Sequence, residues 1–124
     1  MADKNSILTS VKENLGITED QTDFDNQIIV FINSVLSTLA QLGVGPEGGF
    51  FVTSDAETWD QLIGEDNNLL NMTQTYVYMR VRLMFDPPQS SLVKDVLEAN
   101  MREQEWRLNC AVDPKNTFIS DDQV

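Results

Sequence analysis

The sequence predicts an all-α protein: a small bundle of four or five helices with a long helical hairpin, a glycine-rich loop and an extended C-terminal tail. Apolar residues recur every three or four positions through most of the chain, which is the spacing of one buried helix face. Four of the six glycines cluster in one short segment, and a proline pair interrupts the last long apolar segment. Because 124 residues fit a single core, we expect one helical domain over residues 1–111 and a flexible tail over 112–124.

Two amphipathic helices are expected first. The earlier one spans Ser6 to Leu15, with Asn5 as its N-cap and Gly16 as its stop. The later one is capped by Thr18 or Thr22. Its apolar positions repeat at helical spacing: Phe24, Ile28, Phe31, Ile32, Val35, Leu36, Leu39 and Leu42.

The segment from Gly43 to Gly49 is too rich in glycine for a helix or strand interior, so it is expected to be a loop. No Gly-Lys-Ser/Thr sequence follows it, which excludes a phosphate-binding loop of that kind. A brief extended piece over 50–52 leads to Ser54 and Glu57, whose spacing matches a capping box. We therefore expect a short helix to begin at Asp55 and to end at Gly64.

The helical hairpin begins at Asn67 or Asn68 and breaks at Asp86, Pro87 and Pro88, since proline removes a backbone donor and disfavours helix in the residue before it. The first arm is apolar around most of its circumference and should be central and buried. Its two arginines, Arg80 and Arg82, should each reach a carboxylate or the surface.

The second arm of the hairpin has an apolar first half and a charged second half. We expect its apolar positions, like those of the other helices, to face the core. They are Leu92, Val93, Val96, Leu97 and Met101. The charged run from Arg102 to Arg107 has little periodicity, so the far end of this arm is expected to project from the body.

Composition excludes several classes of function. The chain has no histidine and one cysteine, Cys110, so histidine-dependent catalysis and an internal disulfide are impossible. Lys and Arg number 8 against 20 Asp and Glu, and the net charge of -12 disfavours binding to nucleic acid phosphates. No segment has the length and apolarity of a membrane span or signal peptide. We expect a protein made and used inside a cell, with no membrane, metal or cofactor.

Catalysis by Asp and Glu side chains alone is still possible. The candidate acids form four groups near expected helix starts, in loops or in the tail: Glu19 with Asp20, Asp23 with Asp25, Glu65 with Asp66, and Asp121 with Asp122. Helix capping and the helix dipole explain the first three groups. An enzyme that uses only carboxylates is therefore disfavoured, whereas an acidic DNA mimic or inhibitor that binds a basic partner stays open as an alternative.

Three places are candidates for contact with partners. Trp106 is embedded among charges with Arg102 and Arg107, where a tryptophan either anchors an interface or covers surface of its own chain. The glycine loop is either a flexible connector or a partner-binding loop, with contacts at Gly48, Gly49 and Phe50. Phe118 and Ile119, the two apolar residues of an otherwise polar tail, either lie in a disordered end or order on contact with a partner.

These segments together resemble the head-to-tail connector, or adaptor, proteins of tailed bacteriophages, especially phages of Gram-positive bacteria. The resemblance covers most of the chain. It rests on four stretches: ILTSVKENLGI, TDFDNQIIVFINSVLSTLAQLGVG, TYVYMRVRLMFDPPQSSLVKDVLEAN and MREQEWRLN with the tail that follows.

The resemblance implies a structural, non-enzymatic virion protein at the head-to-tail interface, assembled in the host cytoplasm. It implies a ring of twelve copies beneath the portal protein, with DNA passing through without specific binding. Residues from about Ala111 to Val124 match the portal-binding extension, in which Asn116, Phe118 and Ile119 are the candidate contacts. The loop from Gly43 to Phe51 matches a region that faces a neighbouring copy or the next head-completion or tail component.

Overall fold

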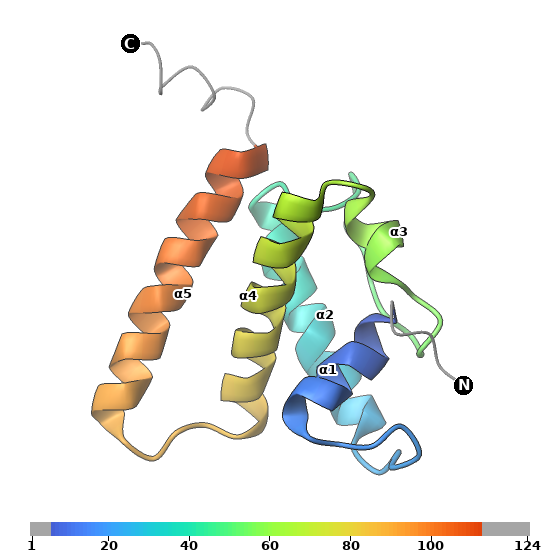
Figure 1. Cartoon of the computed structure of the whole chain (residues 1–124), viewed down its shortest axis with the longest axis vertical. Coiled ribbons are helices and arrows are strands. Elements are labelled where there is room, and N and C mark those ends of the chain that lie inside the picture. The colour runs from blue at the N-terminus through green and yellow to red at the C-terminus, as the bar shows by residue number, and fades with distance from the viewer. Residues whose placement is uncertain (1–5, 113–124) are drawn as a thin grey trace.

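A computed structural model of the chain describes residues 6–112, and within that range it contains five helices and no strand. The helices are α1 (Ile7–Leu15), α2 (Asp25–Gln41), α3 (Trp59–Ile63), α4 (Asn67–Phe85) and α5 (Ser91–Val112). Figure 1 shows α4 between α2 and α5, with α1 and α3 on the side away from α5. The all-α prediction is confirmed. Asn116, Phe118 and Ile119 of the tail lie outside the described residues.

The first two helices end where glycine or a loop was expected, but their N-caps differ from the prediction. The cap of α1 is Ser6, whose hydroxyl accepts a hydrogen bond from the amide of Thr9, so the assignment to Asn5 is wrong by one residue. Gly16 ends α1 in the left-handed conformation, as expected. The N-cap of α2 is Phe24, which makes no side-chain cap. Thr22 contributes only its backbone carbonyl, which accepts from the amide of Asp25, so neither threonine caps α2.

The capping box lies four residues later than predicted. Thr58 and Gln61 satisfy each other's backbone amides at the start of α3, so this helix begins at Trp59 and not at Asp55. Glu57 instead accepts hydrogen bonds from the amides of Thr53 and Ser54, which folds the preceding residues into a turn. The predicted stop at Gly64 is confirmed.

The stability of this turn should decrease at acid pH, where the Glu57 carboxylate becomes protonated. Burial acts to raise the pKa of Glu57, but the hydrogen bonds from Thr53 and Ser54 outweigh it and hold the pKa below the usual 4.5. A carboxylate with a lowered pKa contributes stability that is present above its unfolded pKa and is lost as pH falls through its folded pKa. We expect the amide signals of Thr53 and Ser54 to move with pH in an NMR titration whose midpoint lies below 4.5. Glu57→Gln should abolish that movement; a midpoint at or above 4.5 would contradict the assignment.

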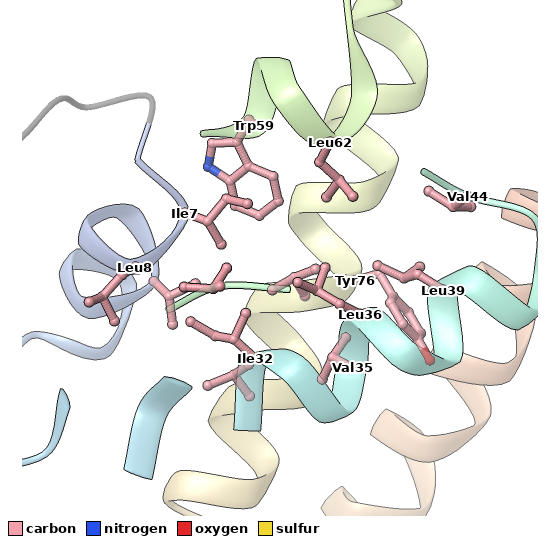
Figure 2. Close-up of a cluster of buried hydrophobic side chains, with 14 of the residues drawn as sticks. Ile7, Leu8, Ile32, Val35, Leu36, Leu39, Val44, Trp59, Leu62 and Tyr76 are labelled. Carbon is pink, nitrogen blue, oxygen red and sulfur yellow. The ribbon is translucent and has the colours of Figure 1, made fainter. Parts of the chain in front are cut away.

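The core lies where α1, α2, α3 and α4 meet. Figure 2 shows Ile7 of α1, Ile32 and Leu36 of α2, Trp59 of α3 and Tyr76 of α4 converging on it. Trp59 is 1% exposed, and its indole N–H donates to the hydroxyl of Ser10 at 2.9 Å. The polar atom of this large side chain is therefore satisfied inside the core, as burial requires.

The hairpin forms with its break at the predicted place, since α4 ends at Phe85 and α5 begins at Ser91. Both arginines of the first arm behave as expected. A guanidinium nitrogen of Arg80 lies 4.0 Å from Glu105, and Arg82 donates to the backbone carbonyl of Asn14 at 2.9 Å. The buried hydroxyl of Tyr76 also donates to Glu105 at 2.6 Å, which ties α4 to the second half of α5.

Most of the predicted packing of α5 is wrong: of the five apolar positions expected to face the core, Met101 is buried and Leu97 is half-buried, while Leu92, Val93 and Val96 are exposed. Its C-terminal half is anchored: Met101 and Leu108 are buried, and the side-chain amide of Asn109 donates to the carbonyl of Leu42 at 3.0 Å. Its apolar first half is exposed, and the two arms diverge toward the turn that joins them (Figure 1). Leu92 and Val96 therefore do not face the core.

Candidate interaction surfaces

Two of the candidate acids have structural roles. Asp66 caps α4 by accepting from the amide of Leu69, and Asp25 forms an ion pair with Lys12 at 2.9 Å. Among residues 6–112 no group of three or more acidic or cysteine side chains is arranged to hold a metal ion. What the fold presents is surface for contact with other molecules.

One exposed apolar surface is a line of four residues along α5: Leu92, Val96, Ala99 and Trp106, here called the α5 seam. Leu92, Val96 and Trp106 are 72%, 58% and 68% exposed. A helix turns about 100° per residue, so Leu92 points about 180° away from the buried Met101. The seam therefore faces away from α4. Leu92, Val96 and Ala99 follow the four-and-three spacing of a helix-packing stripe, and the charged Glu103 occupies the next position of that spacing, before Trp106.

Sequence reasoning found only part of this seam. It identified Trp106 and the neighbouring arginines, and the structure places Arg102 and Arg107 on the exposed surface beside the seam, with Arg107 paired to Glu103. It assigned Leu92 and Val96 to the core. The spacing of Leu92, Val96 and Ala99 extends to Trp106 across Glu103, and this spacing is the sequence feature that connects Trp106 with Leu92 and Val96.

The turn between α4 and α5 borders a second surface. Asp86, Pro87 and Pro88, the predicted hinge, lie in this turn. Beside it, a groove of about 350 Å³ opens between the two arms, and Pro87, Pro88 and Arg102 are among the residues that line it. The structure thus brings one predicted interface residue, Arg102, next to the hinge.

The third surface is a groove of about 580 Å³ beside the glycine loop, here called the loop groove. Gly48, Gly49 and Phe50 line it, together with α2 residues such as Ser37. Gly48 and Gly49 have φ angles of 92° and 93°, which non-glycine residues rarely adopt. The predicted loop is confirmed, and its path across α2 creates an open groove.

Asn33 holds the end of this loop against α2. Its side-chain carbonyl accepts from the amide of Val52 at 2.7 Å, and its side-chain amide donates to the Val52 carbonyl at 3.0 Å. One side chain thus pairs with both backbone groups of a residue that is itself buried, as a neighbouring strand would. The sequence offered no signal for this contact, because it joins positions that are 19 apart.

We expect Asn33→Ala to lower the free energy of unfolding by about 1–3 kcal/mol, since it leaves two backbone groups of Val52 without partners. Asn33→Asp keeps the acceptor for the Val52 amide but sets a carboxylate oxygen against the Val52 carbonyl, so it should also be destabilising. The exposed neighbour Ser34 supplies a control, because Ser34→Ala should change stability by no more than about 0.5 kcal/mol. Urea unfolding followed by circular dichroism measures all three. Equal stability of Asn33→Ala and Ser34→Ala would refute the anchoring role.

The described residues form a small helical protein with exposed surfaces along α5, at the hinge and beside the glycine loop. In agreement, a family model described as "Phage connector protein" matches residues 7–115. The chain therefore belongs to the phage connector protein family. Comparison with curated proteins and with solved structures gave no match.

Membership in this family makes the chain a phage connector-type structural protein and a component of the phage particle that interacts with other head or tail components. The family is a structural one and not a family of enzymes. Of the helices over residues 6–112, none combines the length and apolarity that crossing a membrane would require.

Proposed function

We propose that this protein is the subunit of a head-to-tail connector ring, in which twelve copies dock on the portal protein and link the DNA-filled head to the tail. In this proposal the ring assembles in the host cytoplasm, receives the next head-completion or tail component on its far side, and lets DNA pass through its channel. Family membership supports the connector class. The ring of twelve copies and the portal partner are what the resemblance to head-to-tail connector proteins implies.

The α5 seam is the observation that carries the proposal. Its large apolar side chains are exposed although α5 is firmly anchored at its other end by Leu108 and Asn109. A rigid helix that presents a stripe of leucine, valine and tryptophan to solvent is typical of an interface that another chain covers. The alternative of an acidic DNA mimic gains no such support, because the described acids lie at caps, in loops and on several sides of α5.

The charge of the chain also fits passage of DNA. With a net charge of -12 per copy, acids that line a channel would repel phosphates and keep a duplex from sticking. Salt screens this repulsion beyond about 8 Å at physiological ionic strength, so only acids at the channel wall would contribute.

The mass of the purified protein, measured alone and after mixing with the portal protein encoded in the same genome, tests the proposal. We expect a discrete complex that carries one connector ring per portal. A monomer in the absence of portal is compatible, because a partner that binds only the assembled form shifts the equilibrium toward it. A chain that stays monomeric and has no affinity for the portal would overturn the proposal.

In this proposal the C-terminal segment, with Asn116, Phe118 and Ile119, makes the portal contact. Twelve residues follow Val112, and such a segment spans at most about 40 Å when extended, enough to reach a neighbouring body. We expect deletion of residues 113–124 to leave the helical circular dichroism and the unfolding midpoint nearly unchanged, since the core lies within residues 6–112, while portal affinity falls at least tenfold. Equal portal affinity of the truncated and full chains would refute the role of this segment.

A further inference from the structure

Building on the proposed ring, we propose which surfaces join its subunits: the α5 seam of one copy packs into the loop groove of the next copy. The occupant of each surface is thus a second copy of the same chain. Three features of the described residues support this pairing: the shapes of the two surfaces, their positions in the fold and the charges beside them.

The shapes are complementary. The seam projects large side chains, Leu92, Val96 and Trp106, from a straight helix. The groove has small residues on its walls and floor, including Ser37 and Ala40 on α2 and Gly48 and Gly49 in the loop. Small residues let a helix approach closely, and projecting apolar side chains of a helix commonly fill an apolar groove.

The positions of the surfaces favour a ring. The groove is built on α2 and the seam on α5, and these two helices pack on different sides of α4 (Figure 1). One copy therefore carries the projecting surface and the receiving surface on separate flanks. A contact between two different surfaces of identical chains is heterologous, and it produces a closed ring when the rotation between copies closes.

The charges reduce repulsion at this contact. Copies with a net charge of -12 repel one another, so the least acidic surfaces should meet. Among residues 6–112, the only charged residue that lines the groove is Glu47. Beside the seam lie the exposed Arg102 and Arg107; Arg107 pairs with Glu103, whereas Arg102 has no ion pair among the described residues. An arginine near Glu47 of the next copy would give local complementarity.

Cysteine crosslinking in the portal-bound assembly tests this pairing. Val96→Cys places a thiol on the seam and Ser37→Cys places one in the groove, both in a Cys110→Ala background that removes the single native thiol. A short bismaleimide linker joins thiols that come close. The control replaces Ser37→Cys with Asn68→Cys, which puts the second thiol on an exposed position outside the groove. Mass measurement of the same samples reports whether the ring has formed.

We expect the chain with both Val96→Cys and Ser37→Cys to give a ladder of covalent oligomers, because each copy can join two neighbours. An equal mixture of the two single variants should give mainly dimers, and either variant alone should stay uncrosslinked. A ring on the portal without this ladder would overturn the pairing while the proposed function stands. Dimers formed by Val96→Cys alone would also overturn it, since they indicate seam-to-seam contact. Absence of any ring on the portal would instead overturn the proposed function and the pairing with it.

Discussion

Replacing Trp59 with alanine is expected to lower the free energy of unfolding by about 3–5 kcal/mol, the typical cost of removing a large aromatic side chain from a core. Trp59 is 1% exposed and sits where α3 meets α1 and α4. Its ring meets that of Tyr78 edge to face at 6.0 Å, and its N–H satisfies the hydroxyl of Ser10. The variant therefore loses apolar contacts, an aromatic pair and a buried hydrogen bond together. Since small domains are stable by only about 5–15 kcal/mol, a large fraction of the variant molecules would be unfolded in mild urea.

The second tryptophan provides the matched control. Trp106 is 68% exposed, so Trp106→Ala should change the stability of the monomer by no more than about 0.5 kcal/mol. Trp59→Phe keeps most of the apolar contact and should fall between the other two variants. Urea unfolding followed by circular dichroism measures all three. Similar losses of unfolding free energy for Trp59→Ala and Trp106→Ala would contradict the placement of Trp59 in the core and of Trp106 on the surface.

Signals that act over a few residues were read correctly from the sequence. Proline at 87 and 88 ended the first arm of the hairpin near the predicted residue, and glycines at 16 and 64 ended α1 and α3. Where two capping-box spacings lay close together, the prediction placed the helix start at the wrong one. Ser54 with Glu57 and Thr58 with Gln61 both have capping-box spacing, and only the second starts a helix, because Glu57 is held by Thr53 and Ser54.

The orientation of α5 shows what local signals do not contain. This helix has two apolar faces, one with Met101 and Leu108 and the other with Leu92, Val96 and Trp106. Periodicity identifies both faces, but only tertiary contacts decide which one packs on α4. The contacts that decide it, from Tyr76 to Glu105 and from Asn109 to Leu42, join residues 29 and 67 positions apart. The contact between Asn33 and Val52, which joins positions 19 apart, was beyond local signals for the same reason.

The double substitution Leu92→Glu with Val96→Glu is expected to abolish incorporation into the portal-bound ring while the monomer keeps its fold. Both side chains are exposed, at 72% and 58%, so their replacement leaves no cavity, and each should change monomer stability by no more than about 0.5 kcal/mol. In the ring, the same positions would be buried against a neighbour. A carboxylate there would have to lose its hydration without a partner, which is strongly unfavourable. We expect a loss of at least a hundredfold in the amount of connector that co-purifies with portal at equal protein concentration.

Net charge has to be separated from position in this experiment, because the chain is already strongly acidic. Asn68→Asp with Asn71→Asp supplies the control, since it adds the same two negative charges at exposed positions near the start of α4. If general repulsion between copies governs assembly, both double variants should fail equally. If the seam is the buried contact, only the α5 variant fails. Normal ring formation by the Leu92→Glu, Val96→Glu chain would exclude the seam from the interface, and a loss of helical circular dichroism in that variant would show that these residues support the fold of the monomer.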